Sequence, residues 1–417
     1  MRLKDIAYIN VSTLPENTAG SYQFRYIDIS SISSEGEISL DEYYSFSDAP
    51  SRARRIVRQG DILVSTVRTY LRAIAPIDFE AKDIIASTGF AVCTPKKVVN
   101  SQYLSYAIKN NSVINDICKE STGVSYPAIT ASRLSSIDIP FIRIEKQQAI
   151  ADYLDEKTAE IDTQVSLIKE KVATLQKLKQ SLINKVVTKG LNPNAELKDS
   201  GEDWLGQIPA HWEVKRLKDI SFLYSGLTGK SGEDFTPEYE EGTKPYIPFT
   251  NVLYNFEINP NKFNFVHLSS CEIQNKVHCG DLIFLMSSED YDSIAKSAVV
   301  SDELGEVYLN SFCRGLRFTK NSIYPKFINY LLSADCCRDA LRFEARGFTR
   351  INIKIEKIAS HFVFFPPLSE QQAIADYLDA KTAEIDEQIG LLNQKAEAYN
   401  KLKQSLIDEV VTGTRRI

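Results

Sequence analysis

Residues 147–164 read QQAIADYLDEKTAEIDTQ, and residues 371–388 read QQAIADYLDAKTAEIDEQ. The likeness continues at a constant offset of 224, through KLKQSLI at residues 177–183 and 401–407, to VVT at residues 186–188 and 410–412. Of these 42 aligned pairs, 28 are identical. The chain therefore contains an internal repeat, and this repeat determines how its fold is organised.

Both copies have the apolar spacing of a long helix. Apolar residues recur at steps of 3, 4 and 7, from Ile150 through Leu178 to Val186 and from Ile374 through Leu402 to Val410. Such a narrow stripe is typical of a coiled-coil seam, and one helix over these 42 residues would span roughly 63 Å. We expect the two copies to pair as an antiparallel coiled coil with pseudo-twofold symmetry. A helix packed on its own domain is the alternative.

Weaker repeats precede each helix. RLKDI occurs at residues 2 and 216, QGDILVS at 59 resembles CGDLIFL at 279, and STGVSYPAI at 121 aligns with ARGFTRINI at 345. Runs rich in β-branched residues predict strands, and residues 101–110 and 324–343 predict short helices. We therefore expect an α/β (α+β) fold with two variable globular domains at residues 1–140 and 213–366, helical regions at 141–190 and 367–417, and a Gly- and Pro-rich linker at 191–212.

Composition indicates a soluble globular protein. The chain has 417 residues, 43% of them apolar and 25% charged, and it lacks the roughly 20-residue apolar run of a membrane span. Its start, MRLKDIAYIN, has no apolar signal-peptide core. Seven cysteines without a CxxC favour reduced thiols and a cytoplasmic location.

The sequence offers little catalytic chemistry. GLTGKS at residues 226–231 is too short for a P-loop, and His267, Cys271, His278 and Cys279 lack the spacing of a metal site. No nuclease or adenine-methyltransferase motif is recognisable. A self-sufficient endonuclease or methyltransferase would need a metal or S-adenosylmethionine site, so we expect a non-enzymatic protein.

Positive charge is concentrated in two regions although the net charge is −6. Residues 52–72 hold six arginines and one acid, and residues 314–357 hold ten bases and four acids. Such patches are typical of phosphate contacts, whereas Arg and Asn also recognise guanine and adenine edges. The predicted DNA-binding residues are Arg54, Arg55, Arg68, Arg72, Thr122, Gly123, Ser125, Tyr126, Arg314, Arg346, Gly347, Thr349, Arg350 and Asn352. A solvated charged face is the alternative for each patch.

Three features together resemble the specificity subunit of type I restriction-modification systems, over essentially the whole chain. They are the repeated QQAIADYLD-x-KTAEID, preceded by PPLSE in the second copy, the KLKQSLI-x-x-VVT helix ends, and LNPNAELKDSGEDWLGQIPAHWEVKRLKDI at residues 191–220. The resemblance implies two domains that each recognise half of a split, asymmetric DNA site. It also implies that the two helices hold these domains apart and set the gap between the half-sites.

The same resemblance implies partners and assigns the cofactors to them. Two methyltransferase subunits would dock on the helices, and restriction (motor) subunits would join the complex. S-adenosylmethionine, ATP and Mg²⁺ would belong to those partners, with none in this chain. Lys146 stands where the second copy has Glu370, which predicts unequal docking at the two copies. A coiled-coil scaffold whose end domains bind protein rather than DNA remains the alternative.

Overall fold

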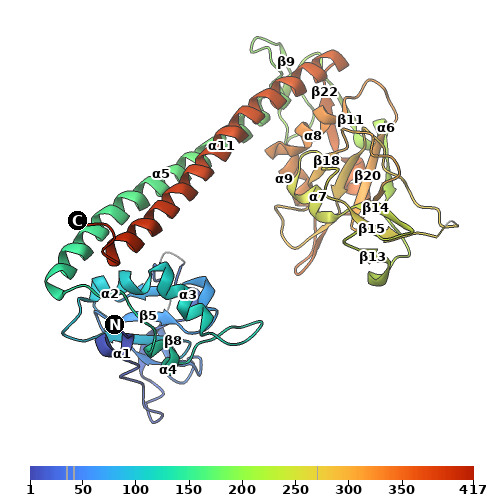
Figure 1. Ribbon diagram of the computed structural model, residues 1–417. Helices are drawn as coiled ribbons and strands as arrows, with labels where there is room; N and C mark the ends of the chain where they lie inside the picture. Colours follow the sequence, from blue (N-terminus) through green and yellow to red (C-terminus); the bar gives the residue numbers. More distant parts are fainter. Residues whose placement is uncertain (34–35, 41–42, 270) are drawn as a thin grey trace. The chain divides into compact units, whose positions relative to one another are not determined.

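The computed structural model describes residues 1–417 except 34–35, 41–42 and 270. It divides into two compact units, which are coloured along the chain in Figure 1. Unit 1 comprises residues 1–170 and 392–417, and unit 2 comprises residues 171–391. Each unit therefore contains part of both repeats, because the long helix of each repeat contributes to both units.

Unit 1 contains two four-stranded sheets. The first has the order β1–β8–β5–β6 and is antiparallel throughout, whereas the second has the order β3–β2–β7–β4 with a parallel β2–β7 pair. The strands are β1 (Ala7–Ile9), β2 (Gln23–Ile27), β3 (Tyr43–Ser45), β4 (Ala53–Ile56), β5 (Ile62–Ser65), β6 (Ile74–Pro76), β7 (Ile84–Ser87) and β8 (Phe90–Pro95). All four residues of β5 and of β7 are buried, so both central strands lie inside the core.

Short helices complete unit 1. They are α1 (Leu3–Ile6), η1 (Ile29–Ser31), η2 (Thr69–Leu71), α2 (Ser101–Ile108), α3 (Asn111–Lys119) and α4 (Ala131–Ser135). Helices α2 and α3 lie over the first sheet (Figure 1), and fully buried Tyr103 and Leu104 of α2 share one core with Ile62 and Val64 of β5. Asn100 caps α2 by accepting a hydrogen bond from the Tyr103 amide, which begins the helix at the predicted position.

Unit 2 repeats the topology of the first sheet, whereas the fourth strand of its second sheet lies at the opposite edge from that of unit 1. Its first sheet has the order β12–β20–β16–β18, and its second has the order β13–β15–β14–β19 with a parallel β14–β19 pair. The strands are β12 (Ser221–Ser225), β13 (Phe235–Thr236), β14 (Thr243–Ile247), β15 (Asn264–His267), β16 (Leu282–Leu285), β18 (Ser297–Val299), β19 (Tyr308–Leu309) and β20 (Cys313–Phe318). The predicted α/β fold with two repeated domains is confirmed.

The remaining elements of unit 2 surround these sheets. They are β9 (Leu197–Asp199), β10 (Gln207–Pro209), β11 (Glu213–Arg216), α6 (Leu217–Ile220), η3 (Gly232–Asp234), α7 (Phe249–Tyr254), β17 (Ser287–Ser288), α8 (Pro325–Ser333), α9 (Asp335–Glu344), β21 (Ile351–Asn352), α10 (Ile355–Ser360) and β22 (Phe362–Phe365). The pairs β9–β10, β11–β22 and β17–β21 are antiparallel.

The segment that we interpreted as a linker, residues 191–212, is folded. Strands β9 and β10 pair within it, and Trp212 is buried, stacked on Phe364 with an interplanar angle of 23°. Its indole N–H donates to Glu370, which also bonds His211 at 2.7 Å. Because Glu370 holds this segment, the Lys146/Glu370 difference has a structural cause inside unit 2.

The long helices α5 (Ile144–Lys189) and α11 (Leu368–Val411) pair antiparallel within each unit (Figure 1). In unit 1, Lys403 bonds Asp162 at 2.6 Å, and in unit 2, Lys179 bonds Asp386 at 2.6 Å. Asp162 and Asp386 are repeat mates, as are Lys179 and Lys403, because each pair is 224 positions apart. The same ion pair therefore forms twice with the roles of the helices exchanged.

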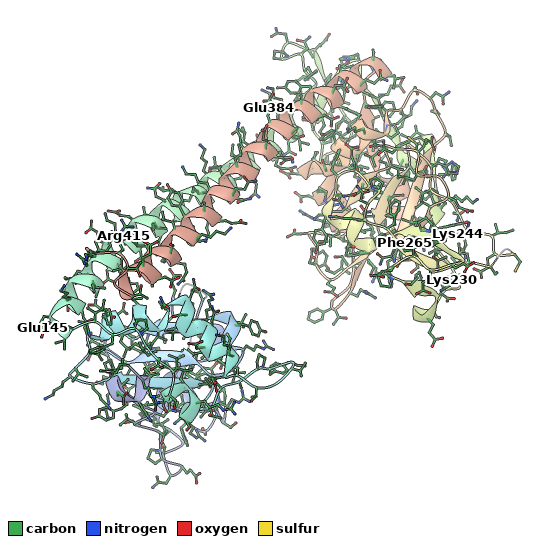
Figure 2. All side chains as sticks on the ribbon, in the orientation of Figure 1. Glu145, Lys230, Lys244, Phe265, Glu384 and Arg415 are labelled. Atoms are coloured by element: carbon green, nitrogen blue, oxygen red, sulfur yellow. The ribbon has the colours of Figure 1, made fainter. Side chains whose placement is uncertain are left out.

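The apolar stripe on these helices is narrower than predicted. Ile161, Val165 and Ile168 are buried, but Leu178 and Leu402 are 55% and 51% exposed. A helix with 3.6 residues per turn drifts away from a strict heptad, which moves these leucines off the contact face. Glu145 and Glu384, labelled in Figure 2, also lie on the exposed surface of α5 and α11. Among the described residues, no helix is long and apolar enough to cross a membrane.

A buried glutamine fixes the start of each long helix to its domain. Gln147 and Gln371 are fully buried. Their amide groups donate to the carbonyls of Ile142 and Pro366, and their Oε1 atoms accept from the amides of Asn100 and Tyr324. A buried amide without such partners would cost about 1–3 kcal/mol, so each glutamine determines how its helix leaves the domain.

The C-terminal part of each long helix contacts the globular domain of the other repeat through an asparagine–aspartate pair. The asparagine and the aspartate are interchanged between the two units. In unit 1, Asp408 of α11 accepts from the backbone and side-chain nitrogens of Asn111 at 2.9 and 2.7 Å. In unit 2, Asn184 of α5 accepts from the Asp335 amide at 2.9 Å and donates to its carboxylate at 2.6 Å. Asp335 begins α9, so this contact also marks the break in residues 324–343, where we predicted one helix and the structure has two.

Candidate nucleic-acid interface

The predicted turn of unit 1 is a closed loop between α3 and α4. Thr122 and Ala128 exchange two backbone hydrogen bonds of 2.9 Å, and Gly123 adopts φ +115° between them. Val124 is fully exposed and Tyr126 is 61% exposed. The Arg68 amide donates to the Pro127 carbonyl at 2.7 Å, which attaches the loop to the end of β5.

Unit 2 carries the same loop between α9 and α10. Arg346 and Asn352 exchange backbone hydrogen bonds of 2.9 and 2.8 Å, and Gly347 adopts φ +143°. Phe348, the repeat mate of Val124, is 98% exposed. A Cβ on Gly347 would lie 2.0 Å from the Arg350 carbonyl oxygen, so only glycine fits at this turn. Both loops therefore present one apolar side chain to solvent at the same position.

Both loops are anchored in the same way. The Ile129 amide donates to Thr66, and the Thr66 amide donates to Gly89, in the turn between β7 and β8. In unit 2, the Ile353 amide donates to Met286, and the Met286 amide donates to Phe312, in the turn between β19 and β20. Each loop is thus held at the end of a central buried strand, a rigid support for a binding surface.

The structure brings Arg68 and Tyr126 together. The Arg68 guanidinium lies 4.5 Å from the centroid of the Tyr126 ring, and Arg68 itself adopts a left-handed conformation with φ 50°. Stacking of this kind, worth about 0.5–1 kcal/mol at exposed sites, orients the guanidinium while leaving its N–H groups free to donate. The hydroxyls of Thr69 and Ser121, 2.9 Å apart, tie η2 to the base of the loop.

Arg72, Arg54 and Arg55 lie apart from this pair. Arg72 is exposed at the end of η2 and lines a cavity of unit 1. Arg54 and Arg55 belong to strand β4. Arg54 stacks over Phe46 at 4.8 Å, and burial lowers the pKa of Arg55. Arg55 Nε is buried without a partner among the described residues.

In unit 2, three predicted residues come together. Arg314, Asn352 and the aromatic Phe312 line one hollow of about 440 Å³, and the Arg350 guanidinium lies 4.8 Å from the Phe312 ring centroid. Arg314 and Asn352 belong to strands β20 and β21. Ser125 and Thr349 are equivalent positions in the two loops, three residues after the closing residues Thr122 and Arg346.

Two aromatic residues near the second loop were missed by the sequence analysis. Phe312 supports Arg350, and the Tyr291 hydroxyl donates to the Gly347 carbonyl at 3.2 Å. Both are distant from the loop in sequence, so no local pattern indicates them. Val124 was missed too, although its place 224 positions before Phe348 was a usable signal.

The second positive region is smaller than its composition suggests. Arg317 bonds the buried Asp281 carboxylate through two nitrogens at 2.8 and 2.7 Å. Arg338 is buried, where it donates to the carbonyls of Asp292 and Ile294, and burial lowers its pKa to about 10. These two arginines hold the fold together, whereas Arg314, Arg346, Arg350 and the exposed Lys354 remain accessible near the loop.

Comparison with known proteins gives a consistent result. A family model described as the type I restriction modification DNA specificity domain matches residues 1–173 and 209–395. The MjaVIII specificity subunit of Methanocaldococcus jannaschii is 24% identical over 345 residues, covering 81% of this chain and 75% of the relative. The EcoKI specificity subunit of Escherichia coli K12 is 22% identical over 326 residues, covering 77% and 67%.

Solved structures share the fold. A chain from a type I R-M system, solved in a study of complex assembly and conformational transition, superposes with a TM-score of 0.74 at 21% identity, covering 100% of this chain and 97% of that chain. The HsdS subunit of Thermoanaerobacter tengcongensis gives 0.50 at 21% identity, covering 100% and 96%. The family model spans most of the chain, in both repeats. The chain therefore belongs to the family of type I restriction-modification specificity subunits.

Proposed function

We propose that each unit recognises one half of a bipartite, asymmetric DNA site. The observation that carries this proposal is the pair of equivalent loops, at residues 122–128 and 346–352, which share their backbone bonds and their glycine but differ in side chains. Thr122, Ser125 and Tyr126 in one loop correspond to Arg346, Thr349 and Arg350 in the other. Surfaces of one shape with different donors and acceptors suit two different base sequences.

The accessible arginines support a division of roles. Arg68 and Arg350 are each stacked on an aromatic ring, which suits a fixed contact to a base edge. Arg54 and Arg346 also lie over rings, those of Phe46 and Phe343, but Arg54 belongs to strand β4 and Arg346 already donates to backbone carbonyls. We assign these two and the exposed Arg72 to phosphate contacts, which position a protein without reading sequence. In an acidic chain these local bases would supply the affinity for DNA.

We further propose that the long helices bind two methyltransferase subunits. Leu167 and Leu178 of α5 and their repeat mates Leu391 and Leu402 of α11 are each 51–58% exposed. Leucines eleven positions apart share one helix face, and exposed apolar groups mark protein interfaces. Restriction subunits would join this complex in the cytoplasm. S-adenosylmethionine, ATP and Mg²⁺ would bind to the partners, and the chain itself would catalyse no reaction.

Mapping of adenine methylation by long-read sequencing tests this proposal, in cells with the gene intact and deleted. We expect one split motif to lose its methylation on deletion. If the methylome is unchanged while the chain still co-purifies with an active methyltransferase subunit, the DNA-recognition role is wrong. A protein-binding scaffold would then account for the same fold.

A further inference from the structure

A cavity of about 730 Å³ opens in unit 1 beside Tyr106 of α2. It is lined by residues of β6, α2, α5 and α11, among them Ile74, Lys109 and Lys403. The Tyr106 hydroxyl is fixed at the wall, because it donates to Asp155 Oδ1 at 2.7 Å and lies 3.2 Å from Thr158 Oγ1. Within the described part of the chain, no aromatic ring is stacked on Tyr106.

The equivalent place in unit 2 is filled. Tyr330, 224 positions after Tyr106, makes the matching bond to Asp379 Oδ1 at 2.7 Å. The Phe256 ring packs on it with a centroid distance of 4.3 Å and an interplanar angle of 36°. The Phe256 carbonyl accepts from Asn329 Nδ2 at 2.9 Å and from the Val299 amide at 3.0 Å. The chain therefore shows in unit 2 what can occupy this kind of cavity.

A carboxylate accompanies the ring in unit 2. Glu257, the next residue, bonds Lys326 at 2.7 Å, and Lys326 also bonds Asp379 at 2.6 Å. The occupant of unit 2 is thus an aromatic side chain followed directly by an acidic one. In unit 1 the position of Lys326 is taken by Gln102, so a cation for such a carboxylate has to come from elsewhere.

Gly36 is the residue of unit 1 that corresponds to Phe256. Each is nine positions beyond the end of the equivalent strand, β2 at residue 27 and β14 at residue 247. Gly36 has φ +90°, and a Cβ there would lie 2.5 Å from the Ile74 carbonyl oxygen and 2.8 Å from Lys109 Nζ. A ring cannot be attached at this position, so Gly36 provides no counterpart of the Phe256 side chain.

Lys109 provides the positive charge in the cavity of unit 1. Among the described residues, no carboxylate lies within ion-pair distance of its Nζ atom. Burial and the nearby Lys403 together lower the pKa of Lys109 to about 8, although the Asp162, Asp155 and Asp78 carboxylates of the same cavity act to raise it. A partly buried ammonium that makes no direct ion pair has lost hydration without full compensation, and a ligand carboxylate would supply that ion pair.

We propose that the unit 1 cavity receives an aromatic side chain and a neighbouring carboxylate from a partner polypeptide, in the manner that Phe256 and Glu257 occupy unit 2. The ring would pack on Tyr106, and the carboxylate would pair with Lys109. A volume of about 730 Å³ also accommodates the backbone that joins the two groups. This interaction does not depend on DNA recognition, so either proposal can fail without the other.

The test uses as its probe a peptide copied from the segment that contains Phe256 and Glu257. A fluorescein-labelled peptide with the sequence YNFEI, copied from residues 254–258, is titrated with the full-length protein and followed by fluorescence anisotropy. We expect saturable binding. Peptides with the Phe256→Ala or the Glu257→Gln change should bind at least about fivefold more weakly, since each loses one of the two contacts.

Protein variants locate the site. Lys109→Met should weaken the YNFEI peptide about fivefold but leave the Glu257→Gln peptide unaffected, because that peptide has no carboxylate to lose. Lys97→Met removes an exposed lysine of the same unit and should change neither. Absence of saturable binding at millimolar protein, or equal affinity for the parent and the Phe256→Ala peptide, would overturn the proposal. The peptide comparison needs no variant protein, so it holds even if Lys109→Met misfolds.

Discussion

His361 is a buried titratable base of unit 2. It stacks on Trp204 with a ring-centroid distance of 5.2 Å, and its Nε2 atom has no partner among the described residues. Burial lowers its pKa from 6.5 to about 4. Below pH 6.5 the unfolded chain therefore binds a proton that the folded protein does not.

We expect the stability of unit 2 to fall as the pH drops from about 6.5 to about 4, by a contribution on the order of 3 kcal/mol. His361→Phe keeps the stacked ring and removes the titrating group, so it should flatten this part of the profile. Denaturation midpoints measured across this pH range check the expectation. His278→Phe, at an exposed histidine, is the control and should keep the wild-type slope.

The exchanged polar pairs predict a second effect at single residues. Asn184→Asp would place two carboxylates together, because Asn184 faces Asp335, and should lower stability by about 1 kcal/mol. Adding Asp335→Asn recreates the arrangement of Asn111 with Asp408 and should recover the lost stability. A double-mutant cycle by urea denaturation measures this coupling. Additive effects of the two changes would contradict it.

Among the elements, the long helices followed most directly from sequence. The apolar period predicted residues 147–188, and α5 covers 144–189, because side-chain spacing alone determines an amphipathic helix. The break between α8 and α9 could not be predicted, since it depends on Asn184, 151 positions away. The folded state of residues 191–212 could not be predicted either, because its stability comes from Trp212 packing on Phe364, a contact between distant segments.

The candidate site was predictable only in part, for a related physical reason. Two loops were located by the repeat, and a glycine in each marks the positive φ of the turn. The partners that orient the arginines, such as Phe312 for Arg350, come from other strands. Charge counting also could not separate the accessible Arg350 from Arg317, which is paired with buried Asp281.

The exposed leucines of the helices carry a prediction at the scale of the element. Leu178→Glu and Leu402→Glu should each weaken co-purification of a methyltransferase subunit, because a charge would have to be buried at the interface. Thermal stability should change little, since both side chains are about half exposed. Lys177→Glu, at the position before Leu178, is the matched control. Undiminished co-purification in the double leucine variant would place the docking surface elsewhere.

At the scale of the whole molecule, we expect a variant in one unit to change recognition of one DNA half-site and a variant in the other unit to change recognition of the other half-site. Arg350→Ala should relax selectivity at one half-site and Arg68→Ala at the other, each by about 1–3 kcal/mol. The assay is methylation of a DNA library with both half-sites varied, by the chain reconstituted with its methyltransferase. Arg415→Ala, at the labelled arginine of Figure 2, removes the same charge and should change neither. If both loop variants relax the same half-site, the assignment of one half to each unit is wrong.

A gene that encodes residues 147–188 and again their close copy at 371–412 offers recombination two matching places for a crossover. Moving the first domain to the place of the second would bring Asn111 against Asn184, and two amides can still hydrogen bond. The reverse move would bring Asp335 against Asp408, two carboxylates that repel each other. We therefore expect this one polar contact to decide which rearranged chains are stable. Moving the first domain to the second position should be tolerated better than the reverse move.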